Sequence, residues 1–347
     1  MAESYIVTGA AGFIGARFVE AARKRGASVV SVDMKSDPKA GGANAFETRP
    51  EHRGIDFGTK LDVEELEPYL AREGAALAKS LTAVVHFGAC SDTMELDESV
   101  HERLNVAYSK MLWSWCSEHR VPFVYASSAA TYGDGASGYD DDESKLASLQ
   151  PLNPYGWSKL RFDLWALERE KAGEAPPSWA GFKFFNVYGF GERHKGRMAS
   201  VVLHSSDQIQ KSGLVKLFKS HKAGYADGEQ KRDFVYVDDV VDVCTFAASG
   251  AIKRGIYNLG TGQARTFFDL ARATFRAFDR EPNIELIDMP EALRERYQYF
   301  TEAKMSRLRA AGYDRPFTSL EDGAKRYVER LLAHASGAGA AGGATPK

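Results

Sequence analysis

Three glycines between an apolar run and an amphipathic run constrain the fold of this chain more than any other feature. The apolar run Ser4–Thr8 is predicted to be a strand, and Phe13–Arg25 a helix with its apolar residues on one face. Gly9, Gly12 and Gly15 lie at the junction. They permit a tight turn and allow a pyrophosphate to approach the helix N-terminus, where N–H groups and the helix dipole favour anions. The alternative is a plain glycine turn.

The residues that follow favour a dinucleotide-binding unit over a plain turn. The next apolar run, Val29–Asp33, ends in an acidic residue roughly 20 positions after the glycines, where this kind of unit carries the carboxylate that binds the ribose. Leu81–Phe87 and Pro122–Ser127 are two more apolar runs, separated by a predicted helix around Asn105–His119. Gly181–Tyr188 is predicted to be a further strand, and Lys35–Gly54, rich in glycine and low in apolar residues, is predicted to be a loop. Strands this uniformly apolar are typical of a parallel sheet covered on both faces. The sequence therefore predicts an α/β fold, a doubly wound Rossmann domain.

Composition excludes several classes of protein. With 45 Lys+Arg against 47 Asp+Glu, the chain lacks the basic excess that nucleic-acid binding needs. It contains no apolar run of about 20 residues, the length of a membrane span, and we expect no targeting segment before the first strand. Cys90, Cys116 and Cys244 are odd in number and lack metal-ligand spacing, which favours a reduced, cytoplasmic compartment.

A serine, a tyrosine and a lysine form the candidate catalytic group. Tyr155 and Lys159 are four residues apart on a predicted helix and so share a face. A phenol is a poor base at neutral pH, but Lys⁺ and an oxidised nicotinamide beside it would lower its pKa. Ser128 follows the strand Pro122–Ser127, at the sheet edge where α/β proteins bind ligands, and can hydrogen-bond a substrate oxygen. Together the three residues predict hydride transfer.

The chain resembles the extended short-chain dehydrogenase/reductases of the nucleotide-sugar epimerase type. The G-x-x-G-x-x-G spacing, the Tyr/Lys pair and Asn258–Gly262 (NLGTG) belong to this wide family. Narrower stretches are similar to its enzymes that epimerise ADP-linked heptoses, and the resemblance runs to about residue 330. The other stretches that carry it are His86–Thr93 (HFGACSDT), Tyr125–Gly133 (YASSAATYG), Phe185–Gly189 (FNVYG), His194–Ser200 (HKGRMAS), Lys231–Asp239 (KRDFVYVDD) and Arg296–Thr301 (RYQYFT).

The resemblance implies an internal redox cycle on ADP-heptose. A hydride leaves C6 of the heptose to bound NADP, rotation about C5–C6 presents the other face of the 6-keto intermediate, and the hydride returns with inverted configuration. Tyr155 would be one acid/base group, and the resemblance places Lys195 as the second. Desolvation would have to lower the pKa of that lysine. The alternative is that Lys195 only binds phosphate or substrate oxygens.

The resemblance also implies binding residues. The cofactor set is Gly9, Gly12, Phe13, Ile14, Gly15, Asp33, Met34, Lys35, Lys39, Lys60, Phe87, Gly88, Ala89, Cys90, Ser91, Asn105, Tyr155, Lys159, Val187 and Lys195. The substrate set is Ser128, Asn186, Arg197, His204, Phe218, Lys219, Ser220, His221, Arg232 and Tyr297. A guanidinium can also bind a diphosphate through two bonds, which favours Arg232, although a surface ion pair with Asp233 is the alternative.

The choice of cofactor depends on the residues around Asp33. A carboxylate there favours NAD, because it accepts a bond from the ribose 2′-OH and repels a 2′-phosphate. Lys35, Lys39 and Lys60 could reverse that preference, and the resemblance implies NADP. We expect NADP, with NAD as the alternative.

The predicted organisation has two lobes. Residues 1–185, with about 233–262, would form the NADP-binding Rossmann domain, 186–232 and 263–330 a smaller α/β substrate-binding lobe, and 336–347 a disordered tail. The resemblance suggests a homo-oligomer. Two other functions remain open: a nucleotide-sugar 4-epimerase or dehydratase of the same family, and a non-catalytic dinucleotide-sensing protein. Ala129 and Ala130 stand where a 4,6-dehydratase would carry an acidic pair, which disfavours that enzyme.

Overall fold

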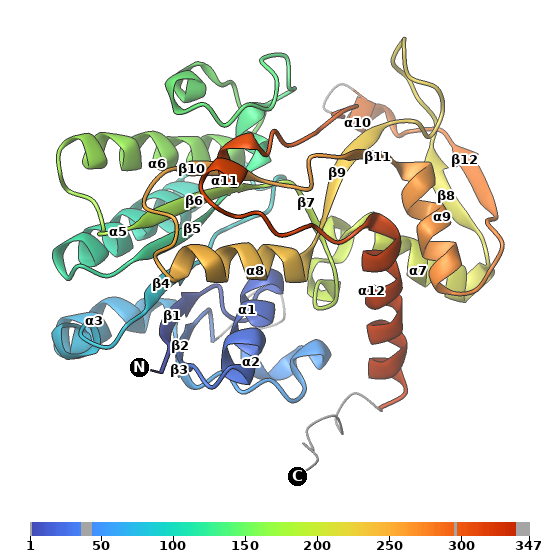
Figure 1. Ribbon diagram of the computed structural model, residues 1–347. Coiled ribbons are helices and arrows are strands. Elements are labelled where there is room, and N and C mark those ends of the chain that lie inside the picture. Colours follow the sequence, from blue (N-terminus) through green and yellow to red (C-terminus); the bar gives the residue numbers. More distant parts are fainter. Residues whose placement is uncertain (1, 36–43, 295–296, 338–347) are drawn as a thin grey trace. The chain divides into compact units, whose positions relative to one another are not determined.

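A computed structural model describes residues 2–35, 44–294 and 297–337 (Figure 1). The chain divides into two units, Met1–Phe184 with Val240–Leu259 and Lys304–Asp314, and Phe185–Asp239 with Gly260–Ala303 and Arg315–Lys347. Within the described ranges, no helix is long and apolar enough to cross a membrane. Lys39 and most of the predicted tail lie outside the described residues.

The first unit is built on a seven-stranded parallel sheet with the strand order β10-β6-β5-β4-β1-β2-β3. This order reverses between β1 and β4, as in doubly wound nucleotide-binding folds. The predicted α/β fold is therefore confirmed. The strands are β1 (Ser4–Thr8), β2 (Ser28–Val32), β3 (Thr59–Leu61), β4 (Ala83–His86), β5 (Phe123–Ser128), β6 (Trp179–Phe184) and β10 (Ile256–Leu259).

Helices flank both faces of this sheet (Figure 1), which explains why β1, β4 and β5 are buried along almost their whole length. The α-helices of the unit are α1 (Phe13–Lys24), α2 (Ala45–Thr48), α3 (Val63–Leu77), α4 (Glu98–His101), α5 (Tyr108–Glu118), α6 (Pro154–Lys171), α11 (Ser306–Ala310) and most of α8 (Val237–Ala248). Its shorter turns are η2 (Pro50–His52), the π-helical η3 (Glu102–Ala107), η4 (Ala129–Tyr132) and η5 (Glu143–Ser148).

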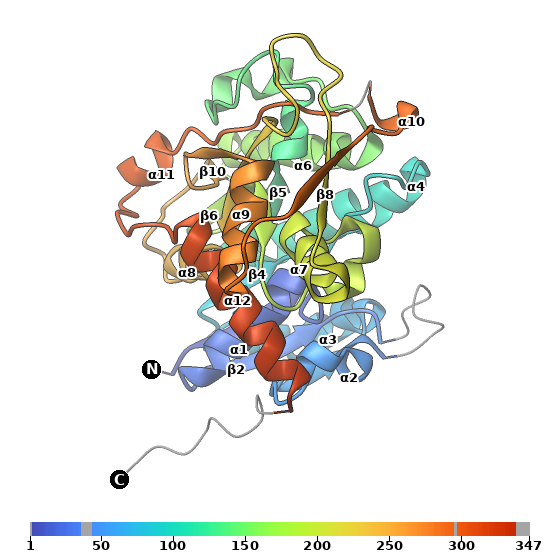
Figure 2. The same cartoon turned by 90° about the vertical axis from the view of Figure 1, so that its right-hand side faces the viewer.

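The second unit holds two small sheets and two long helices that pack together. Strand β9 pairs with β7 in parallel and with β11 in antiparallel fashion, and β8 pairs with β12 in parallel. Helix α9 runs beside α12 (Figure 2). The elements are β7 (Asn186–Tyr188), η6 (Arg193–Met198), α7 (Val201–Ser212), β8 (Val215–Phe218), β9 (Lys231–Tyr236), β11 (Ala264–Thr266), α9 (Phe267–Ala277), β12 (Ile284–Ile287), α10 (Glu291–Arg294) and α12 (Leu320–Ala335).

Two predictions about local structure are wrong. The strand predicted over Gly181–Tyr188 is two strands, β6 and β7, in different sheets. The N–H of Val187 donates to the carbonyl of Phe185 at 2.9 Å, and a bond to the second residue back is a γ-turn, which ends a strand. The loop predicted over Lys35–Gly54 contains α2 and η2 in its described part, and the Asn44 side chain caps α2.

Candidate active site

The turn between β1 and α1 forms a closely packed cradle. Gly9 has φ +65°, and a Cβ there would lie 2.6 Å from the backbone nitrogen of Gly88, in the loop after β4. A Cβ on Gly15 would overlap the carbonyl oxygen of Gly9. Gly12 is the N-cap of α1 and provides no side-chain cap. Only glycine fits at positions 9 and 15, and the uncapped helix N-terminus suits a pyrophosphate.

Asp33 follows β2 and holds the glycine turn from the other side. Its Oδ2 accepts from the N–H of Ala11 at 2.8 Å and its Oδ1 from the N–H of Met34 at 2.8 Å. The Arg49 guanidinium donates to the carbonyl oxygen of Ala11. Arg49 was not among the predicted residues. It precedes η2, and only the folded chain brings it against the glycine turn.

The lysines predicted near the ribose have acidic neighbours. Lys35 Nζ lies 2.7 Å from a carboxylate oxygen of Glu65, and Lys60 Nζ lies 3.6 Å from Glu47. All four side chains are more than one-third exposed, so these pairs contribute little to stability. Because these ion pairs are weak, Lys35 and Lys60 can exchange the carboxylates for another anion.

Asn105 anchors the loop predicted to line the nicotinamide side. Its side chain is fully buried; Oδ1 accepts from the N–H of Cys90 at 2.8 Å, and Nδ2 donates to the Cys90 carbonyl at 3.0 Å and to Ser158 Oγ at 2.9 Å. Asn105 thus ties the loop after β4 to helix α6. The geometry shows Asn105 holding that loop, and its predicted contact with the cofactor stays a prediction.

Ser128, Tyr155 and Lys159 lie together at the carboxyl end of β5. Asn153 caps α6 through a 2.8 Å bond from the Gly156 N–H, which sets Tyr155 in the first turn and Lys159 one turn later. Lys159 Nζ donates to the carbonyl oxygen of Ala126 in β5 at 2.8 Å. Ser128, at the end of β5, caps η4 by accepting from the N–H of Ala130 at 3.1 Å. These contacts fix all three groups on regular elements.

Burial controls the ionisation of this group. It raises the pKa of Tyr155, which a hydrogen bond with Ser128 lowers in part. The expected lowering of the Tyr155 pKa therefore does not come from the protein's own residues. Burial also lowers the pKa of Lys159 to about 8, against the opposing charge of Asp163. At neutral pH Lys159 is still mostly protonated and can stabilise a phenolate.

Lys195 lies in η6 of the second unit, beside a buried carboxylate. Its Nζ is 3.6 Å from Oε2 of Glu192, whose side chain is fully buried. Glu192 accepts from the N–H of Ser200 at 2.8 Å and from its hydroxyl at 2.5 Å, and Ser200 is the N-cap of α7. Glu192 thus ties the Lys195 segment to α7. The sequence did not single out Glu192.

Several predicted substrate residues gather in the second unit. The Arg232 guanidinium lies over the Tyr297 ring, 5.2 Å from its centroid, and donates to the carbonyls of Lys231 and Gln298. Arg232 is buried, so the predicted alternative of a surface ion pair is wrong; Asp233 instead accepts backbone N–H groups, including those of Thr261 and Gly262.

The remaining substrate candidates occupy three places in the unit. The backbone N–H of His221 donates to the Tyr299 hydroxyl at 3.0 Å, beside Tyr297, and Lys219 lies 3.3 Å from Asp288. Phe218 ends β8, Ser220 follows it, and Asn186 lies in β7, next to the predicted cofactor residue Val187. Arg197 is exposed in η6, and His204 is half-buried on α7.

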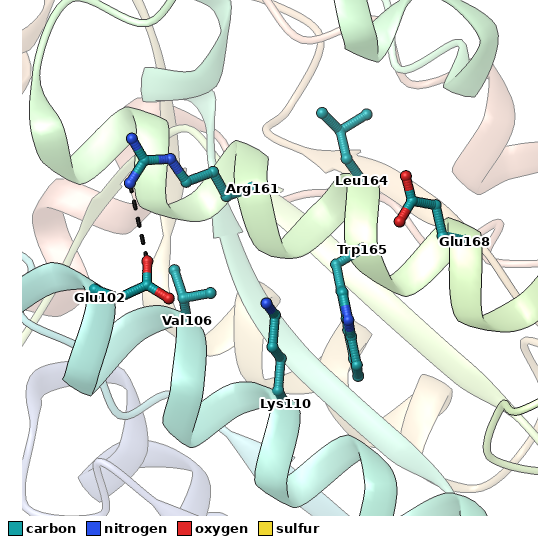
Figure 3. Close-up of a pocket in the computed structure, with 7 residues that line it drawn as sticks. All are labelled: Glu102, Val106, Lys110, Arg161, Leu164, Trp165 and Glu168. Atoms are coloured by element: carbon teal, nitrogen blue, oxygen red, sulfur yellow. Dashed lines mark ion pairs between the residues drawn. The ribbon is translucent and has the colours of Figure 1, made fainter.

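A cavity of about 480 Å³ opens between η3, α5 and α6 (Figure 3). It is lined by Glu102, Val106, Lys110, Arg161, Leu164, Trp165 and Glu168. Arg161 pairs with Glu102 at 3.9 Å, and none of the lining residues belongs to the predicted site. We do not assign this cavity to the reaction.

The glycine cradle, the acidic residue after β2 and the Ser/Tyr/Lys group on a doubly wound sheet define a dehydrogenase-like, nicotinamide-dependent class of protein. The model of the NAD dependent epimerase/dehydratase family matches residues 5–260, and the chain belongs to this family. This confirms the resemblance and nicotinamide dependence.

Named relatives cover nearly the whole chain. The ADP-L-glycero-D-manno-heptose-6-epimerase of Fusobacterium nucleatum is 46% identical over 336 residues, 94% of this chain and 98% of the relative. The protein of the same name from Nitratidesulfovibrio vulgaris strain Hildenborough is 45% identical over 332 residues, which cover 95% of this chain and 98% of that relative. The crystal structure of the Helicobacter pylori ADP-L-glycero-D-manno-heptose-6-epimerase matches with a TM-score of 0.77 and 27% identity, covering 96% of this chain and 97% of that one.

Proposed function

We propose that this chain epimerises ADP-D-glycero-D-manno-heptose at C6 to ADP-L-glycero-D-manno-heptose, as an isomerase. The observation that carries the proposal is the near-full-length identity of 46% to a relative of that name, in a chain that sets Ser128, Tyr155 and Lys159 together at the end of β5. The same combination disfavours a dinucleotide-sensing protein, which has no need of a proton-transfer group.

Lys159 stabilises the Tyr155 phenolate, which takes the proton of the C6 hydroxyl and becomes the neutral phenol. A nicotinamide dinucleotide bound at the glycine turn would supply the hydride acceptor and donor for this cycle. Ser128 donates a hydrogen bond to the substrate oxygen as its charge develops. Gly9, Gly12 and Gly15 would hold the pyrophosphate, because their missing side chains leave the α1 N-terminus open to an anion.

Lys195 is the second acid/base group in this proposal. Inversion at C6 requires proton transfer on two faces of the substrate, and a single tyrosine serves only one of them. The buried Glu192, 3.6 Å from Lys195 Nζ, supports the role because it keeps the ammonium near a carboxylate while the side chain stays 30% exposed. The other proposed role, binding of substrate oxygens, needs the charge alone.

The proposed cofactor is NADP. Arg49, beside the glycine turn, supports this choice because a guanidinium binds a phosphate through two bonds. Lys35 and Lys60 add exposed positive charge near Asp33. NAD is the alternative, favoured by the Asp33 carboxylate.

The cellular compartment and the oligomeric state also stay predictions. Cys90, Cys116 and Cys244 are free thiols, which supports work in the reduced cytoplasm. The predicted assembly is a homo-oligomer. The assignment of residues 1–185 with about 233–262 to cofactor binding, and of 186–232 with 263–330 to substrate binding, likewise stays a prediction.

A proton NMR time course tests the proposed function. ADP-D-glycero-β-D-manno-heptose is incubated with catalytic amounts of protein and no added reductant. We expect the L-glycero epimer to appear until an equilibrium mixture forms, and Tyr155→Phe to stop its appearance. An unchanged spectrum, from protein shown to bind nicotinamide dinucleotide, would contradict the proposal; parallel incubations with UDP-hexoses would then reveal a 4-epimerase.

A further inference from the structure

An ion pair lies completely buried beneath the Ser/Tyr/Lys group. Lys183 on β6 and Asp163 on α6 are joined at 2.6 Å between Nζ and Oδ2, and both side chains have no exposed surface. Removing two charges from water costs several kcal/mol, and an apolar pair of similar size is often as stable. Stability alone therefore does not account for this pair.

The bonds around the pair all lead to the strand end that carries Ser128. Asp163 accepts from the hydroxyls of Ser127 at 2.7 Å and Tyr125 at 3.0 Å. Lys183 donates to Thr131 Oγ1 at 2.8 Å, and Thr131 donates to the carbonyl oxygen of Ser128 at 2.8 Å. Asp163 thus holds Ser127, the residue before Ser128, and Lys183 holds the Ser128 backbone through Thr131.

The pair also acts on the helix that carries Tyr155 and Lys159. Asp163 lies one turn after Lys159 on α6. Lys159 bonds the carbonyl of Ala126 and Asp163 bonds the hydroxyl of Ser127, so α6 is bonded to two consecutive residues of β5. The Asp163 charge raises the pKa of Lys159 and of Tyr155. Lys183 brings a compensating positive charge into the same buried space.

Other titratable groups face this cluster from each neighbouring element. Tyr125 lies on β5, and Tyr132 of η4 has its ring centroid 5.4 Å from Lys183 Nζ. His86 of β4 and Cys90 interact electrostatically with Lys159, and burial lowers the pKa of His86 to about 3. Glu143 acts on Tyr125, and Asp141 acts on Tyr132. Burial keeps His86 and both tyrosines neutral near pH 7, leaving Asp163 and Lys183 as the cluster's opposed charges.

We propose that Lys183 and Asp163 are positioning residues, which fix Ser128 against the Tyr155–Lys159 helix and set, through their opposite charges, the pH range in which that pair works. This inference rests on the proposed function, because it assigns a purpose relative to that reaction. It concerns residues that touch neither substrate nor cofactor.

The test is whether removal of the negative charge and removal of the positive charge shift the pH profile in opposite directions. Asp163→Asn removes a negative charge, so Tyr155 and Lys159 lose their protons more easily, and both limbs of the kcat/KM pH profile move to lower pH by about one unit. Lys183→Gln removes a positive charge and moves both limbs to higher pH. Asp163→Asn/Lys183→Gln restores neutrality and returns the limbs to their original positions. Limbs that stay fixed, or move in the same direction in both single variants, would overturn the inference.

A readout without turnover accompanies the profile. The ultraviolet absorbance of tyrosinate, as the difference between each variant and its Tyr155→Phe counterpart, follows the Tyr155 phenol directly. We expect its midpoint to fall in Asp163→Asn and to rise in Lys183→Gln. An inactive parent protein would refute the proposed function, and unshifted midpoints in an active series would refute this inference.

A milder variant serves if the single charge variants do not fold. Thr131→Val keeps the side-chain shape but breaks the link from Lys183 to the Ser128 carbonyl. We expect kcat to fall about tenfold with KM unchanged, since a displaced Ser128 weakens contacts made in the transition state. Thr274→Val is the matched control, since Thr274 is also buried and bonds the Leu270 carbonyl at 2.8 Å. Equal kcat in Thr131→Val and the parent would overturn the inference.

Discussion

The two proposed acid/base groups are held in different ways. Tyr155 lies in the first turn of an 18-residue helix whose cap, next turn and Asp163 are all bonded within the first unit. Lys195 lies in the short η6 turn, with its side chain 30% exposed and a positive-φ glycine, Gly196, directly after it. The buried carboxylate of Glu192 lies 3.6 Å from its ammonium. We infer that Tyr155 works from a fixed position and that Lys195 has room to adjust to the substrate.

Replacing Tyr155 breaks the fixed half of this comparison. Tyr155→Phe removes the hydroxyl that takes the C6 proton and leaves the half-buried ring in place. We expect kcat to fall about 10³-fold, with an unchanged thermal midpoint and undiminished cofactor binding. NMR turnover and calorimetry measure these quantities. A variant retaining a tenth of the parent activity would remove Tyr155 from its role.

Replacing Lys195 tests the adjustable half. Lys195→Met is expected to lower kcat about 10²-fold, because the second proton transfer then relies on water. Lys195→Arg is the matched control: it keeps the charge but hardly loses a proton at neutral pH. Equal loss in both variants supports the acid/base role, whereas full activity in Lys195→Arg would show that Lys195 only binds.

The pH profile sharpens the comparison at Lys159. Burial lowers the pKa of this lysine to about 8, so a neutral amine replaces the ammonium above that pH and no longer stabilises the phenolate. We expect kcat to decline above pH 8, by roughly tenfold for each further pH unit. Lys159→Arg should remove this decline while lowering the plateau. A parent profile that stays flat well above pH 8 contradicts the role of Lys159.

The smallest expected effect concerns the cofactor. Arg49→Met should weaken NADP binding about tenfold and leave NAD binding almost unchanged, since only NADP carries the 2′-phosphate that the guanidinium would bind. Tryptophan fluorescence titrations with both dinucleotides measure the ratio, and Arg53→Met, a nearby exposed arginine, is the control. Equal weakening for both dinucleotides would mean that Arg49 only supports the glycine turn.

Elements whose ends are marked by local sequence signals were predictable from the sequence. The strand before the glycine turn has the predicted bounds, and α1 ends one residue earlier than predicted, because the glycines and the helix periodicity mark both ends. The Tyr155–Lys159 spacing likewise predicted one helix face. The break at Phe185 was not predictable, because an apolar run gives no sign of a γ-turn.

The parts held by tertiary contacts were not predictable. Helix α7 buries Val202, Leu203 and Ile209, yet its polar residues hid that periodicity. Arg49, Glu192 and the Lys183–Asp163 pair have no distinguishing neighbours in the sequence, and only the fold brings their partners to them. Their roles are read from burial and distance.

The most direct measurement uses substrate deuterated at C6 in ordinary water. In the proposed closed cycle, the hydride leaving C6 returns to the same carbon, and Tyr155 and Lys195 move only hydroxyl protons. It predicts an L-glycero product that keeps its deuterium at C6, observed by proton NMR and mass spectrometry. A product that carries solvent protium at C6 would contradict it.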